Sequence, residues 1–153
     1  MIYVQITCMM RIHCIRRDLA DVLLYHLDNV QQRPGVETIV GAQSDPLYGP
    51  MLLIGSGGIL VELVRDATMR LLPVSATDVS AMIDSLKVNR LLAGYRGKPP
   101  ADRKALEAAA MALGRFYLDH RARIEEIEIN PLIVRASGAV AVDVRVAWSK
   151  ENK

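Results

Sequence analysis

A predicted β-hairpin near the C-terminus carries the residues best placed to bind a metal ion. Two β-rich runs, 127–134 and 139–146, flank a Ser-Gly turn. With the turn centred just before Ser137, Asn130 lies directly opposite Asp143, and opposed residues have Cβ atoms about 5 Å apart. An amide oxygen and a carboxylate at that separation can share one hard cation, because Mg²⁺ prefers oxygen ligands. The spacing therefore predicts a magnesium site at these two residues.

The same hairpin permits a second interpretation. A turn shifted by one residue would move Asp143 to the other face of the ribbon and separate it from Asn130. Glu128 shares a strand face with Asn130, and polar residues on a strand face can simply be solvent-exposed. Spacing alone leaves both interpretations open.

The segment Gly55-Ser56-Gly57-Gly58 is a candidate phosphate-binding turn. Glycines let backbone N–H groups approach a phosphate, and Arg70 nearby could add positive charge. The segment lacks the lysine of a P-loop and the spacing of a dinucleotide-binding fingerprint. A tight turn between two strands is the alternative explanation for these glycines.

Histidine and cysteine residues give no sign of nucleophilic catalysis or zinc binding, and no catalytic residue is identified. The three histidines, His13, His26 and His120, have no partner at a suggestive spacing. Cys8 and Cys14 form only one pair, whereas a structural zinc site needs four ligands. We expect two free thiols in a reducing compartment.

Composition indicates a globular protein. The chain has 153 residues, of which 51% are hydrophobic and 24% charged, and its formal net charge is only +2. Such a balance does not favour binding to nucleic acid or to an anionic membrane. The longest apolar stretch, 51–64, contains Ser56 and Glu62 and is too short to span a bilayer. The basic residues follow the apolar N-terminal residues, unlike the order in a secretory signal. We therefore expect a cytoplasmic protein.

The order of the predicted elements indicates an α+β fold, with a mainly antiparallel sheet and helices on one side. Asp18, Ser75 and Asp102 are positioned to cap three helices. Strands are predicted at 36–42, 51–54 and 69–74 besides the hairpin, with a further apolar segment at 59–64 and a loop at 91–100.

Five segments, in this order, resemble one family: 35–41 (GVETIVG), 45–50 (DPLYGP), 57–62 (GGILVE), 91–100 (LLAGYRGKPP) and 128–132 (EINPL). They look like the C-terminal half of the ATP-grasp domain in NDP-forming acyl-CoA synthetases. These are enzymes of the ADP-forming acetyl-CoA synthetase β-subunit type, which are related to the succinyl-CoA synthetase β subunit. The resemblance runs from about residue 35 to residue 146.

The resemblance implies a function and a set of site residues. Such enzymes interconvert an acyl-CoA, phosphate and NDP with the free acid, CoA and NTP, and they use Mg²⁺ and ATP or ADP. By resemblance, Asn130 and Asp143 would be the magnesium ligands and Glu37 would contact the nucleotide. The residues near the phosphates would be Gly57, Gly58 and Arg70.

The resemblance also implies what the chain lacks. It divides the sequence into an atypical N-terminal segment with one helix (1–34), an ATP-grasp C-terminal subdomain (35–147) and a tail (148–153). The family's N-terminal subdomain supplies a lysine and a glycine-rich lid, but residues 1–29 contain no lysine. Phosphoryl transfer depends on a preorganised site that excludes water. We therefore expect ATP or ADP binding by the isolated chain to be weak or absent, and the chain to be incompetent alone.

Two main functional interpretations follow. The chain is a fragment or subunit of an acyl-CoA synthetase that acts with a complementary chain, or it is a pseudoenzyme remnant that serves as a protein-interaction or oligomerisation module. A third interpretation is a plain α+β domain that binds no ligand. The surface where the missing half would lie should be exposed and partly apolar. We therefore expect a complementary subunit or a homo-oligomer as partner.

Overall fold

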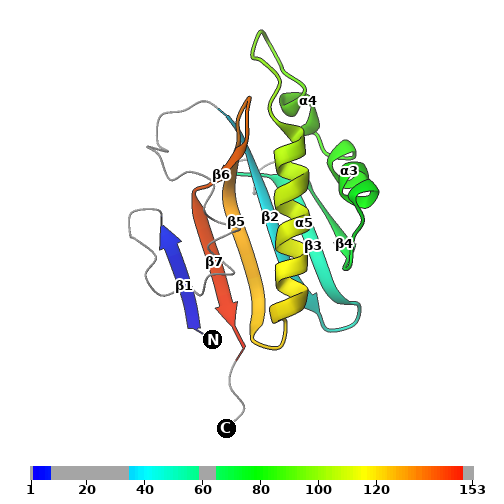
Figure 1. The fold of residues 1–153 in the computed structure, drawn as a ribbon, viewed down its shortest axis with the longest axis vertical. Coiled ribbons are helices and arrows are strands. Elements are labelled where there is room, and N and C mark those ends of the chain that lie inside the picture. Colours follow the sequence, from blue (N-terminus) through cyan, green and yellow to red (C-terminus); the bar gives the residue numbers. More distant parts are fainter. Residues whose placement is uncertain (1, 8–34, 59–64, 150–153) are drawn as a thin grey trace.

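The computed structural model describes residues 2–7, 35–58 and 65–149 (Figure 1). Its strands are β1 (Ile2–Thr7), β2 (Val36–Asp45), β3 (Gly49–Ser56), β4 (Ala67–Leu71), β5 (Ile124–Val134), β6 (Ala139–Ala141) and β7 (Asp143–Trp148). Its helices are α3 (Ala76–Asp84), α4 (Asn89–Leu92) and α5 (Arg103–His120).

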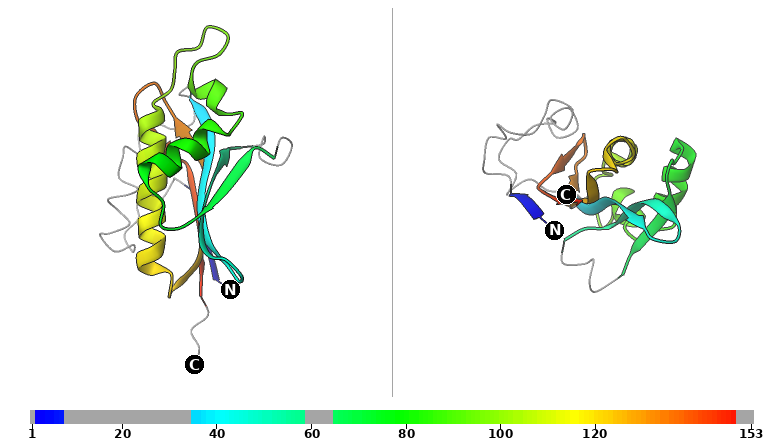
Figure 2. Two further views of the ribbon diagram at one scale, coloured as in Figure 1. Left: turned by 90° about the vertical axis from the view of Figure 1, so that its right-hand side faces the viewer. Right: turned by 90° about the horizontal axis from the view of Figure 1, so that it is seen from below.

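The strands form one antiparallel sheet in the order β1-β7-β5-β2-β3-β4, with β6 paired to β5. Figure 2 shows α5 and α3 against one face of this sheet. α5 contacts β2, β3 and β5, and α3 contacts β3 and β4. Among the described helices, none covers the opposite face, which we call the open face. The expected antiparallel α+β fold with helices on one side is confirmed.

The helices begin and bury residues as their sequences predict. The side chain of Asp102 accepts a hydrogen bond from the Ala105 N–H and caps α5. At α3, Ser75 and Asp78 form the expected capping box. The apolar stripe of α5 is buried in the core against the sheet; its members are Leu106, Ala110, Leu113 and Tyr117.

Some element boundaries differ from the sequence prediction. The second arm of the hairpin is divided into β6 and β7 at Val142, whose N–H donates to the carbonyl of Pro131. β4 starts two residues before the predicted range 69–74 and ends three residues before the end of that range. The loop expected at 91–100 is preceded by α4, which takes in its first two residues. The predicted helix after Asp18 and the apolar segment 59–64 lie outside the described residues.

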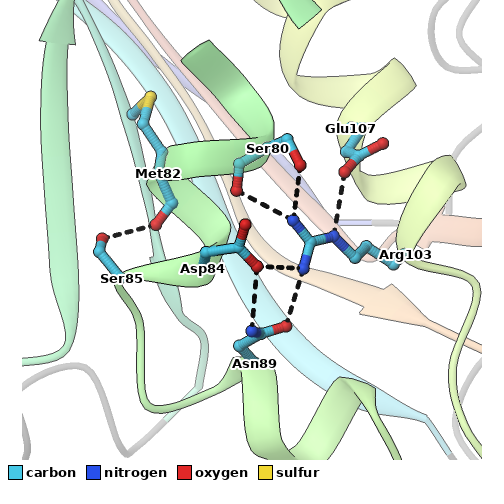
Figure 3. Close-up of polar contacts among 7 residues, drawn as sticks. All are labelled: Ser80, Met82, Asp84, Ser85, Asn89, Arg103 and Glu107. Carbon is cyan, nitrogen blue, oxygen red and sulfur yellow. Dashed lines mark hydrogen bonds and ion pairs between the residues drawn. The ribbon is translucent and has the colours of Figure 1, made fainter. Parts of the chain in front are cut away.

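Arg103 joins the three helices (Figure 3). Its Nη2 donates to the carbonyl and hydroxyl oxygens of Ser80 on α3. Its Nη1 bonds the carboxylate of Asp84 and the amide oxygen of Asn89, and its Nε bonds Glu107. The pKa of Arg103 is raised, chiefly by the hydrogen bond to Asp84. The planar guanidinium thus fixes α3 and α4 at the start of α5.

Replacing Arg103 by methionine should lower the free energy of unfolding by about 2 kcal/mol, because hydrogen bonds to charged groups contribute about 1.5–3 kcal/mol and water replaces part of the loss at these partly exposed partners. Urea unfolding followed by circular dichroism measures the change. Arg115→Met is the matched control, since Arg115 is an exposed arginine of the same helix. Equal stability of the two variants would contradict a joining role for Arg103.

Candidate functional site

The open face of the sheet carries the expected site residues of the hairpin. Alternate residues of the central strands, such as Val40, Leu52 and Ile129, are buried in the core beneath the helices. Because side chains alternate along a strand, their neighbours face the other way. Glu128 is one of these: it lies on the open face, half-buried, and is paired with Arg145 of β7.

Asn130 and Asp143 occupy opposite positions on β5 and β7. Leu132 pairs with Ala141 on one side of them, and Ile129 pairs with Val144 on the other. Counting inward from either pair brings Asn130 opposite Asp143. The hairpin therefore has the register that the turn position predicted, not the register shifted by one residue. Both side chains lie on the open face, since Ile129 and Val144 beside them are buried in the core.

The glycine turn after β3 contacts this pair. The Gly58 N–H donates a hydrogen bond of 3.1 Å to Oδ1 of Asn130, 72 residues away in the chain. The Gly57 N–H donates to the backbone carbonyl of Glu37 at 2.9 Å. The carboxylate of Glu37 lies against Gly58, where a Cβ atom would be only 1.9 Å from Oε2. Four of the six expected site residues therefore lie together: Glu37, Gly57, Gly58 and Asn130. Asp143 lies opposite Asn130.

Both glycines are required by this close packing. Gly58 has a φ of +64°, which residues with a Cβ rarely adopt. A Cβ on Gly57 would lie 2.5 Å from the backbone oxygen of Thr38. The glycines therefore make a tight turn between strands, and their N–H groups are bonded within the protein, to the carbonyl of Glu37 and to Oδ1 of Asn130.

Arg70 is not brought together with the glycines. It pairs with Leu52 across β3 and β4, and Leu52 is buried beneath the helices. Opposed residues share a face, so Arg70 lies on the helix-covered side, where it forms an ion pair with Asp78 of α3. Leu52 is six residues from Gly58, which corresponds to roughly 20 Å along an extended chain.

Glu128 is a site residue that spacing did not single out as a ligand. Its pKa is raised, first because burial disfavours its charged form and then because Glu126 and Asp143 are negative. Arg145 and a hydrogen bond from Asn130 act in the opposite direction. Its position two residues from Asn130, on the same face of the predicted strand, is the feature of the sequence that could have identified it. The charges around it make this part of the open face electronegative, which favours a cation.

The donor set fits Mg²⁺ bound together with a ligand. In the part of the chain that the structure describes, no three His, Cys, Asp or Glu side chains cluster to hold a metal. Asn130 and Asp143 supply two oxygen donors. Mg²⁺ is commonly bound through one or two carboxylates plus the phosphates of a substrate, with water completing the shell. These residues therefore suit a metal that arrives with a nucleotide better than a permanently bound ion.

No helix among the described residues is long and apolar enough to cross a membrane.

Comparisons with known proteins agree on one family. A family model described as an ATP-grasp domain matches residues 5–147. The β subunit of ADP-forming acetate–CoA ligase II from Pyrococcus furiosus is 37% identical over 116 residues, which are 74% of this chain and 49% of that protein. The β subunit of ligase I from the same organism is 36% identical, over 84% of this chain and 53% of that protein.

A solved structure shares the fold. Acetyl-coenzyme A synthetase 1 of Ca. Korarchaeum cryptofilum, in complex with coenzyme A and Mg-AMPPCP, is similar with a TM-score of 0.74 and 38% identity. The match covers 77% of this chain and 55% of that one. The chain spans about half the length of these β-subunit relatives. The resemblance seen in the sequence is confirmed: the chain belongs to the ATP-grasp domain family and is homologous to subunits of ADP-forming acyl-CoA synthetases.

Proposed function

We propose that this chain is the nucleotide- and magnesium-binding half of the ATP-grasp domain of an NDP-forming acyl-CoA synthetase. The observation that carries the proposal is the meeting of Gly58 with Asn130, opposite Asp143, on the open face. Two oxygen donors at one place, one of them held by the Gly58 N–H, suit a Mg²⁺ ion that also binds phosphate oxygens. The relatives' names and the Mg-AMPPCP complex of the similar structure agree with this assignment.

Each residue has a proposed role. Asn130 and Asp143 hold Mg²⁺, which when bound would neutralise phosphate charge. Gly57 and Gly58 lie near the phosphates, and Glu37 contacts the nucleotide. Arg70 is left out of the proposal, since its ion pair with Asp78 holds it on the helix-covered side.

The reaction of the whole enzyme would join acyl-CoA, phosphate and NDP to give the acid, CoA and NTP. This chain would contribute one wall of the nucleotide site. One wall of a site does not by itself give the preorganised, water-excluding environment that phosphoryl transfer requires. We therefore propose that the chain is incompetent alone and acts with a complementary synthetase chain that covers the open face.

One observation favours a second candidate, a remnant that acts as an interaction module. Met69 and Leu71 of the edge strand β4 are 42% and 48% exposed. They alternate with Arg70 and so lie on the open face, beside Leu53 and Met51 of β3. An apolar strip of this kind at a sheet edge is a typical interaction surface.

Thermal unfolding with and without Mg-ATP tests the proposal. Nucleotide present at ten times its dissociation constant should stabilise the fold by about 1.4 kcal/mol, and EDTA should remove most of that gain. Light scattering on the same samples reports the oligomeric state. An unchanged melting temperature at millimolar Mg-ATP would contradict nucleotide binding and leave the interaction module as the better explanation.

A further inference from the structure

The structure assigns Thr38 as the positioning residue of the Gly58–Asn130 contact, an inference that rests on the proposed function for its consequence in binding. Thr38 is fully buried, and it lies on the same face of β2 as Val36 and Val40, which pack in the core away from the site. It therefore touches neither metal nor nucleotide. Its hydroxyl donates a hydrogen bond of 2.8 Å to the carbonyl of Leu132 on β5.

Thr38 lies at a break in the strand pairing. It pairs with Leu132, whereas Val40 pairs with Ile129, so the single residue between them on β2 faces both Asn130 and Pro131 on β5. Proline has no N–H to donate to the ladder. Such a bulge leaves the position of the extra residue poorly determined by backbone bonds. The Thr38 hydroxyl supplies a fixed bond just beyond the bulge, two residues from Asn130.

Thr38 also fixes the opposite side of the contact. On β3 it pairs with Ser56, and the next residue, Gly57, donates its N–H to the carbonyl of Glu37. Gly57 has no room for a side chain because the Thr38 backbone lies directly against it. The glycine turn is therefore placed by the backbone of Thr38, while the Asn130 bulge is placed by its hydroxyl.

The consequence is that both partners of the Gly58–Asn130 hydrogen bond are positioned from one residue. Removing the hydroxyl frees the bulge but leaves the glycine turn in place. The distance between the Gly58 N–H and Asn130 should then vary, and the proposed metal ligand would lose its orientation. A purely structural role for the hydroxyl would lower stability without this local effect.

Three variants separate these possibilities. Thr38→Val keeps the shape and removes the donor, and Thr38→Ser keeps the donor. Ser85→Ala is the control, because Ser85 also donates its hydroxyl to a backbone carbonyl, that of Met82, in the helical layer. Thr38→Ala replaces the valine variant if the latter does not fold.

The first measurement needs no ligand. In ¹H–¹⁵N spectra of the full chain, the Gly58 amide should shift in Thr38→Val, return toward its wild-type position in Thr38→Ser, and stay unchanged in Ser85→Ala. A Gly58 amide that is insensitive to Thr38→Val overturns the inference, whatever the outcome for nucleotide binding.

The second measurement is calorimetric titration with Mg-ADP. Thr38→Val should weaken binding about tenfold, as the loss of residues that orient metal ligands commonly does, and Thr38→Ser should restore it. Equal weakening in Ser85→Ala, or none in Thr38→Val, overturns the role in binding. A wild-type chain that binds no Mg-ADP at millimolar concentration refutes nucleotide binding by the chain alone, and the Gly58 amide then decides the positioning role separately.

Discussion

Replacing both Asn130 and Asp143 by alanine should abolish the magnesium-dependent part of nucleotide binding. These residues supply the two oxygen donors proposed for Mg²⁺, so their loss should weaken Mg-ATP binding about a hundredfold or more, or roughly 2.7 kcal/mol. Asp143→Ala alone should have the larger single effect, because the carboxylate supplies charge as well as a donor. Calorimetric titrations with Mg-ATP and with ATP in EDTA measure the magnesium-dependent part.

Gln43→Ala and Asp119→Ala provide matched controls, since they remove an exposed amide from β2 and an exposed carboxylate from α5. Both control variants should bind like the wild type. Wild-type affinity in the Asn130/Asp143 double variant would place the metal elsewhere and remove the basis for the proposed function.

The second large effect is expected at Asp66, whose carboxylate is buried and accepts three hydrogen bonds. Ser56 donates its hydroxyl at 2.7 Å, and the N–H groups of Lys87 and Val88 each donate at 2.8 Å. Asp66→Ala would leave these donors without a partner, at a cost of about 3 kcal/mol in the free energy of unfolding. Asp45→Ala is the control: this partly exposed turn carboxylate also accepts two backbone N–H bonds, which water can replace. Urea unfolding should show a clearly smaller loss for it.

The pH dependence of stability provides an independent test at Asp66. Burial raises its pKa, but the hydrogen bonds from Lys87, Ser56 and Val88 together outweigh burial and hold the pKa below its usual value. A carboxyl with a lowered folded-state pKa contributes stability that is present above the unfolded pKa of about 3.9 and lost as pH falls through the folded pKa. Unfolding measured from pH 7 to pH 3 should therefore cost the wild type more stability than Asp66→Asn. Parallel curves would contradict this contribution.

The elements that the sequence predicted well depend on local signals. A cap and an apolar stripe lie within a few residues of one another, so the start of α5 at Asp102 and its buried face were readable. The hairpin is local in the same sense: a turn between neighbouring strands sets the register, and the register sets which residues face each other. For that reason the Asn130 and Asp143 pair could be identified before the fold was known.

Other features required contacts between distant segments. Arg70 is closer in sequence to Gly58 than Asn130 is, yet it faces the helices and pairs with Asp78, because β4 returns antiparallel along β3. The roles of Thr38 and Asp66 could not be predicted from the sequence, because the sequence does not show whether a hydroxyl or a carboxylate is exposed or buried.

The sequence by itself determined the family and the antiparallel α+β class, and it gave the pairing of one amide with one carboxylate as one of two possible registers, because each of the motifs, periodicities and turns involved is local. The tertiary structure decided that Glu37, Gly58 and Asn130 meet on the face of the sheet opposite the described helices. Strand order and the bulge beside Thr38 bring these segments together, and both arise from non-local packing that spacing along the chain does not encode.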